Sequence, residues 1–136
     1  EHIDADVGGH ARYRNFRLVD TALAGQASHS LTMLYGLKEE GTNAMEILWV
    51  LNREIRLLVN VIDHPQGVEA GLKQERVWEK RKDYLRTAAR QHNSHSGQDM
   101  LRQCAAIDQC IKGVTKANVW DLFGALIMQL SGKPIR

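Results

Sequence analysis

The stretch between Asn43 and Pro65 constrains the fold more than any other part of the sequence. Twelve of its residues are apolar and fall on most sides of a helix: Met45, Ile47, Leu48, Trp49, Val50, Leu51, Ile55, Leu57, Leu58, Val59, Val61 and Ile62. A narrow polar stripe interrupts them: Glu46, Arg53, Arg56 and Asn60. A helix this apolar needs neighbours on several sides, so we expect one over residues 43–63 at the centre of the fold.

The rest of the chain has the periodicity of helices and almost no strand signal. We expect further helices over residues 11–24, 26–40, 77–90, 98–112 and 118–130, with a short helix through Leu72. Gly25, Gly41 and Gly113 stand where helices should end, and residues 91–97 are predicted to form a polar loop. The sequence therefore predicts an all-α helical bundle.

Composition limits the class of protein. Hydrophobic residues make up 43% and charged residues 25% of the 136 residues, so a packed core is expected. A net charge of +2 restricts any DNA contact to a local patch. Apolar runs stay well below the ~18 residues of a membrane span, and no signal peptide is evident. Because the first residue is Glu1 and not Met, we expect a piece of a longer protein, with processing of the chain as the alternative. The two lone cysteines are typical of a reducing, cytoplasmic protein.

Few residue patterns suggest chemistry. The sequence has no phosphate-binding loop and none of the HExxH, CxxC or GxSxG motifs. His92 and His95 are too few ligands for a metal site. Two cysteines, Cys104 and Cys110, lie on different faces of a predicted helix, too far apart for a disulfide. We therefore predict no catalytic, cofactor-binding or metal-binding residue.

The most suggestive segment is residues 73–90, where seven Lys and Arg residues stand against three acidic ones. Trp78 lies among these cations, and an aromatic ring beside cations is typical of single-stranded nucleic acid sites. The spacing of Trp78 to Leu85 and Ala89 favours the alternative that Trp78 is a core residue. An intramolecular salt bridge is the alternative for Arg81. Trp49 and Trp120 are predicted to be core.

A series of segments, in this order, carries a family resemblance: Phe16-Arg17-Leu18-Val19-Asp20, Ala22-Leu23-Ala24-Gly25, Leu37-Lys38-Glu39-Glu40-Gly41, Ile47-Leu48-Trp49, Arg53-Glu54-Ile55-Arg56-Leu57-Leu58, Arg76-Val77-Trp78-Glu79-Lys80-Arg81-Lys82, Ala106-Ile107-Asp108, Ile111-Lys112-Gly113 and Trp120-Asp121. From about residue 11 to 131, the chain resembles the delta subunit of the bacterial DNA polymerase III clamp loader. The resemblance implies an AAA+-like architecture without ATPase function. It implies that residues 1–41 end a helical lid domain and that residues 42–136 form a collar domain.

The same resemblance implies partners and a role. A collar of this kind assembles with the tau/gamma and delta-prime subunits, and the N-terminal part of delta, absent here, opens the sliding clamp. The chain would then be a non-catalytic part of the polymerase III holoenzyme, a nucleotidyltransferase complex. Primer-template DNA passes beneath such a collar, which implies DNA or subunit contacts at Arg76, Trp78, Arg81 and Lys82. The rival hypothesis is a free-standing helical DNA-binding domain that uses the basic Arg76–Arg90 helix.

Overall fold

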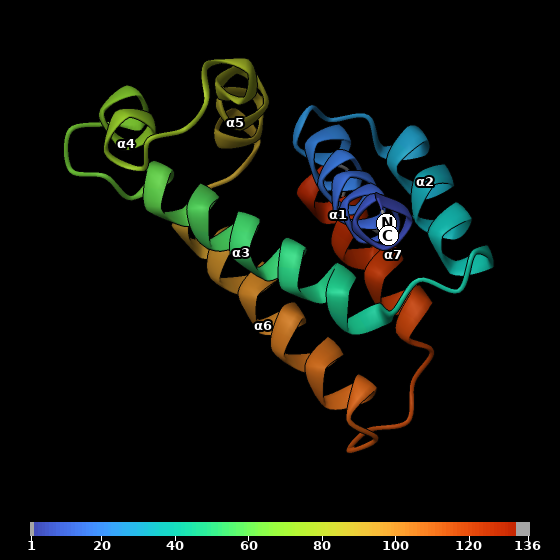
Figure 1. Ribbon diagram of the computed structural model, residues 1–136. Helices are drawn as coiled ribbons and strands as arrows, with labels where there is room; N and C mark the ends of the chain where they lie inside the picture. The colour runs from blue at the N-terminus through green and yellow to red at the C-terminus, as the bar shows by residue number, and fades with distance from the viewer. Residues whose placement is uncertain (1, 133–136) are drawn as a thin grey trace.

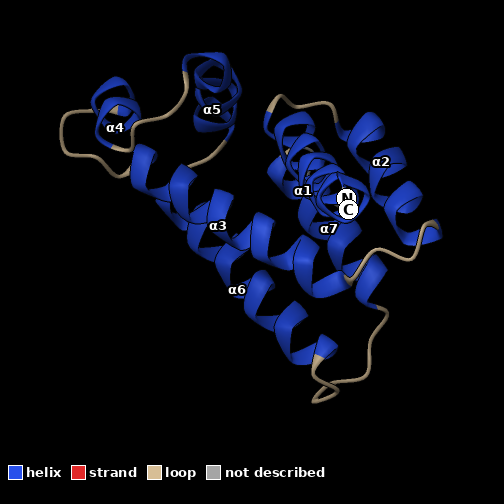
Figure 2. Cartoon of the chain, viewed as in Figure 1, coloured by secondary structure: helices blue, strands red, loops and turns tan. Residues whose placement is uncertain are grey.

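The computed structural model describes the backbone of residues 2–132 and the side chains of residues 12–132. Within this range the chain forms seven helices joined by short loops and no strand (Figure 1 and Figure 2). The helices are α1 (His2–Leu23), α2 (Ala27–Glu39), α3 (Ala44–Ile62), α4 (Val68–Gln74), α5 (Glu79–Gln91), α6 (Ser94–Ile111) and α7 (Val119–Leu130). The predicted all-α class is confirmed.

Helix α3 occupies the centre, as its apolar sequence predicts. The side chain of Asn43 caps it by accepting a hydrogen bond from the backbone N–H of Met45 at 2.8 Å. Helix α6 runs alongside α3. Helices α4 and α5 pack near the C-terminal end of α3, and α1 crosses α3 (Figure 1). Helices α2 and α7 complete the bundle against α1. One continuous cluster of buried apolar side chains joins all seven helices.

The start of α6 corrects the prediction of a polar loop over residues 91–97, because α6 already begins at Ser94. Asn93 and Ser96 form a capping box, in which the side-chain oxygen of each residue accepts a hydrogen bond from the backbone N–H of the other. Gly97 then allows close packing, since a Cβ there would lie 2.7 Å from Cγ2 of Val59. The polar composition of this segment therefore marks a capped helix start rather than a loop.

The other helix boundaries follow the sequence with one further correction. Helix α1 begins at His2, well before the predicted residue 11. Gly25 and Gly41 end α1 and α2 with φ of 87° and 78°, a conformation that side-chain-bearing residues rarely adopt. No helix in the described part of the chain is long and apolar enough to cross a membrane.

Both cysteines are free, which agrees with the predicted lack of a disulfide between them. Cys104 lies in the core, as expected, and burial raises the pKa of its thiol to about 11. Cys110 is half-buried, and its thiol donates a hydrogen bond to the carbonyl of Ala117 at 3.2 Å. Both residues act as packing elements of α6.

Two helical glycines test how closely α4 must approach α3. A Cβ on Gly71 would lie 2.8 Å from the Cα and carbonyl oxygen of Val61, which are backbone atoms that cannot move aside. A Cβ on Gly36 in α2 would meet nothing within 4 Å. We expect Gly71→Ala to lower the free energy of unfolding by about 1–3 kcal/mol. Gly36→Ala should raise it by about 0.5–1 kcal/mol. Urea unfolding measures both, and equal effects at the two sites would contradict this packing.

Candidate functional site

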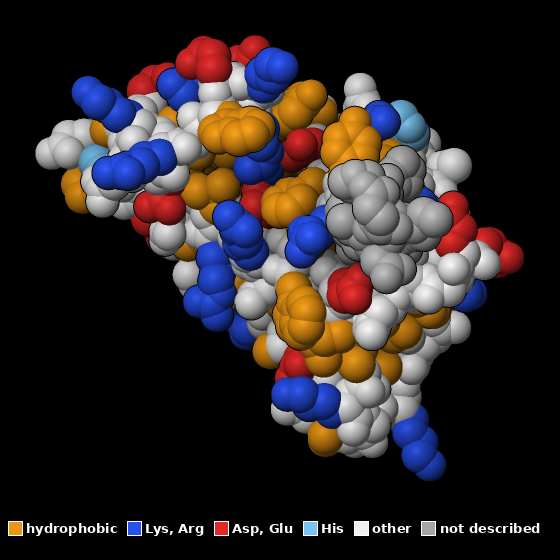
Figure 3. Space-filling view, in the orientation of Figure 1, with side chains coloured by type: hydrophobic (Ala, Val, Ile, Leu, Met, Phe, Trp, Pro, Cys, Tyr) orange, Lys and Arg blue, Asp and Glu red, His pale blue; other side chains and the backbone are white. Residues whose placement is uncertain are grey.

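A groove of about 1290 Å³ opens over α3. Helix α3 forms its floor, α1 forms one wall, and the segment from the end of α4 into α5 forms the other. Figure 3 looks into this face, where hydrophobic side chains and Lys or Arg side chains gather over α3. Six cations and three carboxylates are among the residues that line the groove.

Arg81 ties the three sides of the groove together. From α5, its Nη2 donates to Oδ1 of Asp20 on α1 at 2.7 Å and to Oε1 of Glu54 on α3 at 2.5 Å. Its Nε donates to the same Asp20 oxygen at 3.0 Å. The Glu54 side chain is only 2% exposed and that of Arg81 is 20% exposed, so the pairs are largely shielded from water.

This geometry decides the role of Arg81. Burial by itself would lower the pKa of its guanidinium, but the hydrogen bond with Asp20 and the charge of Glu54 outweigh burial, and the pKa is raised. The positive charge of Arg81 is therefore fixed and already neutralised by two carboxylates of its own chain. The intramolecular salt bridge considered from the sequence is confirmed.

Trp78 is 76% exposed, so its prediction as a core residue is wrong. The reason is local: Trp78 precedes α5 as its N-cap residue, with φ −59° and ψ 142°. The helical spacing to Leu85 and Ala89 therefore does not apply to it. The indole lies instead at the rim of the groove.

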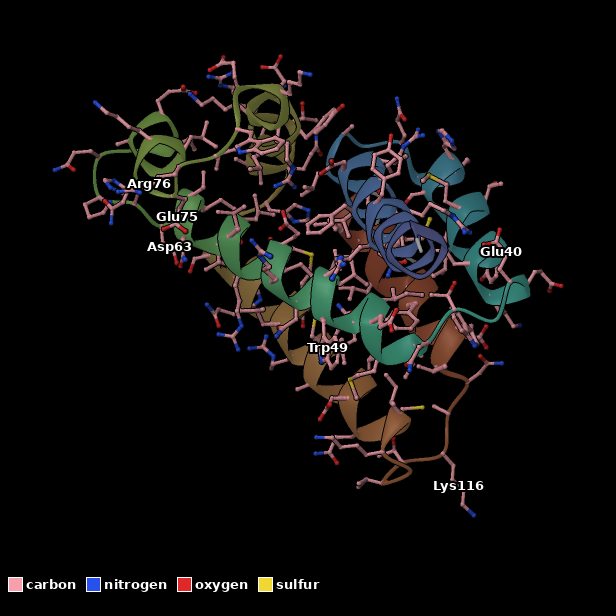
Figure 4. All side chains as sticks on the ribbon, viewed as in Figure 1. Glu40, Trp49, Asp63, Glu75, Arg76 and Lys116 are labelled. Carbon is pink, nitrogen blue, oxygen red and sulfur yellow. The ribbon has the colours of Figure 1, made fainter. Side chains whose placement is uncertain are left out.

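Trp49 is 64% exposed, and its prediction as core is also wrong. It stands three residues after Glu46 and four before Arg53, so it belongs to the polar stripe of α3 rather than to the apolar faces. Figure 4 shows Trp49 toward the N-terminal end of α3 and Arg76 beyond the C-terminal end of that helix. Trp120, by contrast, is half-buried and packs on Phe123 with ring centroids 5.6 Å apart.

Arg76 and Lys82 are placed differently. Arg76 lines the groove and adopts φ 55°, in the left-handed region that favours glycine. It ends α4, where its N–H donates to the carbonyl of Lys73 and the N–H of Val77 donates to that of Leu72, each at 3.1 Å. Lys82 pairs with Glu79 at 3.1 Å and does not line the groove. Three of the four predicted contact residues thus lie in one groove.

The groove also holds residues that sequence reasoning missed. Arg17 lies over the ring of Tyr13 at 6.0 Å from the centroid, and Arg53 lies over the ring of Phe16 at 5.9 Å. All four residues of these cation–π contacts line the groove. The available signal was the cation-bearing polar stripe of α3, which places Arg53 and Arg56 on one exposed face with Trp49.

No set of three or more His, Cys, Asp or Glu residues that would hold a metal ion occurs in the described residues. His92 is occupied structurally: its Nε2 lies 3.0 Å from the carbonyl oxygen of Leu130, and its Nδ1 lies 3.1 Å from Oγ of Ser96. His95 is exposed on the first turn of α6.

Comparison with known proteins identifies the family. Residues 15–136 match the family described as the processivity clamp loader gamma complex, DNA polymerase III C-terminal domain. The chain belongs to this family. It is also 27% identical over 141 aligned positions to DNA polymerase III subunit delta of Escherichia coli (strain K12). That alignment covers 98% of the chain but only 39% of the E. coli protein. This confirms the resemblance to the delta subunit that the order of the sequence segments indicated.

Within this clamp-loader domain, the buried carboxylate makes Arg81 a strong test of the site. We expect Arg81→Ala to lower the free energy of unfolding by about 3 kcal/mol, because Glu54 then remains buried without its hydrogen-bond partner and with only the exposed Arg53 at 4.0 Å. Replacing both residues by methionine should recover much of that loss. The control is Arg102→Ala, which removes an exposed pair with Asp99 and should cost less than about 1 kcal/mol. Chemical denaturation measures the free energy of unfolding of all three variants. Equal losses of stability for Arg81→Ala and Arg102→Ala would contradict a structural role for the ion pairs of Arg81.

Proposed function

We propose that the chain is a non-catalytic collar module of a bacterial DNA polymerase III clamp loader. In this proposal, residues 1–41 end an AAA+-like lid domain and residues 42–136 form the collar. The collar assembles with tau/gamma and delta-prime subunits in the cytoplasm, so that the whole protein opens the sliding clamp and loads it on DNA during replication. The observation that carries the proposal is the family match over residues 15–136.

The packing of the helices supports a rigid scaffold. Helices α1 and α2 from the proposed lid part share one buried apolar cluster with α3 to α7. Arg81 adds a polar tie across the proposed boundary, since it binds Asp20 of α1 as well as Glu54 of α3. A scaffold held in this way presents fixed surfaces to its neighbours, which lowers the entropy cost of assembly.

Mixing experiments test the assembly. Size-exclusion chromatography of the chain with a collar fragment of tau/gamma should give a complex at micromolar concentration, while the chain alone elutes as a monomer. An unrelated helical protein of equal size serves as the control for non-specific association. Separate elution of the two components at these concentrations would count against the collar proposal.

A second candidate role, local contact with nucleic acid, is favoured by the exposure of Trp78 beside Arg76 and Lys80. Exposed indoles stack on unpaired bases, and nearby cations pair with phosphates. Arg81 is left out of this contact because two carboxylates already occupy its guanidinium. Lys82 is left out because it faces Glu79 outside the groove.

Arg76→Gly separates this role from folding. Glycine removes the strain of a left-handed arginine, about 1 kcal/mol, which roughly offsets the entropy that glycine adds to the unfolded chain. We expect an unchanged or slightly higher free energy of unfolding, together with weaker and less salt-dependent binding of single-stranded DNA. Fluorescence anisotropy at several salt concentrations measures the binding. A variant that binds as tightly as the parent chain would remove Arg76 from the contact.

A further inference from the structure

Trp49 is a second exposed indole in the same groove as Trp78, with 64% of its surface open to solvent. From Trp49 the polar stripe of α3 continues along the floor of the groove through Arg53 and Arg56 to Asn60. At 1.5 Å per residue, the helix rises about 17 Å between Trp49 and Asn60. The groove is therefore long as well as open, and Figure 4 shows Trp49 toward one end of α3 and Arg76 beyond the other.

The charges of the groove are unequal once the internal pairs are assigned. Asp20 and Glu54 are both engaged by Arg81, which leaves Glu75 as the remaining carboxylate among the lining residues. Against it stand exposed cations on the floor and both walls: Arg17, Arg53, Arg56, Arg76 and Lys80. Arg56, Arg76 and Lys80 form no ion pair with any described residue. The available charge of the groove is thus positive and suits a polyanion.

The side chains of the groove floor distinguish between two kinds of partner, an amphipathic helix and a single strand of nucleic acid. A docked amphipathic helix requires a continuous apolar strip, whereas on this floor Asn52, Arg53 and Arg56 separate the apolar side chains of Trp49 and Leu57. Two exposed indoles separated by arginines match what unpaired bases and their phosphates require. Paired bases in a duplex are already stacked and do not present their faces to such rings.

We propose that this groove binds a single strand of nucleic acid, with bases stacking on Trp49 and Trp78 and phosphates pairing with Arg53 and Arg56 between them. The length of the floor accommodates up to about five nucleotides at ~3.4 Å per stacked base. This inference rests on the nucleic acid contact of the proposed function and extends it from one residue to a track. Arg81 is a positioning residue in it, since it holds the α5 wall against α1 and α3.

Fluorescence anisotropy with a labelled oligothymidylate tests this track, which runs over Trp49, Arg53, Arg56 and Trp78. The oligonucleotide is about ten nucleotides long, so that it is longer than the site. We expect Trp49→Ala to weaken the binding of the oligonucleotide about tenfold, because the variant loses the stacking of one base on the indole. The control is Tyr35→Ala, which removes an exposed aromatic on α2 outside the groove. In a Trp78→Phe, Trp120→Phe background, the fluorescence of the remaining Trp49 should be quenched as the oligonucleotide binds.

A charge-reversal pair tests the floor. Arg56→Glu and Arg102→Glu change the net charge equally, but only Arg56 lines the groove. We expect Arg56→Glu to weaken binding about tenfold more than Arg102→Glu does, with a duplex of equal length binding less tightly than the single strand throughout. Circular dichroism of each variant verifies that the helices remain folded.

Three results would overturn the track. Binding that survives Trp49→Ala but is lost in Trp78→Ala would restrict the contact to Trp78, and the proposed function would stand. Undetectable oligonucleotide binding by a chain that still forms a complex with tau/gamma would remove the nucleic acid role and leave the collar. Trp49→Ala and Arg56→Glu variants that lose the tau/gamma complex but not the oligonucleotide would make the groove a protein interface.

Discussion

The need to cover α3 is the constraint on which the rest of the structure depends. Leu51, Ile55 and Leu58 are completely buried, and helices α1, α4, α5 and α6 pack against α3. Glycines allow the closest approaches, with Gly71 against the backbone of Val61 and Gly97 against the side chain of Val59. The short helix α4 and the capped start of α6 are therefore positioned by the surface of α3 rather than by their own propensities.

One face of α3 stays uncovered, and its composition gives the molecule a functional surface. The polar stripe becomes the floor of the groove, while Glu54, one residue from the exposed Arg53, turns inward and is sealed by Arg81. Because Arg81 engages Asp20 and Glu54, Glu75 is the one remaining carboxylate among the lining residues, and the other arginines of the groove meet little competing negative charge. The same interaction thus holds the α5 wall against α1 and α3 and keeps two carboxylates from pairing with the other cations of the groove.

The sequence predicted the helices well because their signals are local: the apolar content of α3, the caps at Asn43 and the glycines after α1 and α2. It failed where residue type conflicted with position. Trp49 was assigned to the core because its neighbours in the sequence are apolar, although its spacing from Glu46 and Arg53 places it on the polar stripe. Trp78 was assigned by helical spacing, although it stands before the helix. The burial of Glu54 depends on Arg81, 27 residues away, and on Asp20, 61 residues from Arg81, and no local pattern reveals such a meeting.

Amide hydrogen exchange tests the central position of α3 most directly. If α3 is the element that the other helices cover, the amides of Leu51–Leu58 exchange only through global unfolding, and the free energy from exchange equals that from denaturant unfolding. Exchange of these amides through local opening at a lower free energy than the amides of α2 or α7 would contradict the account.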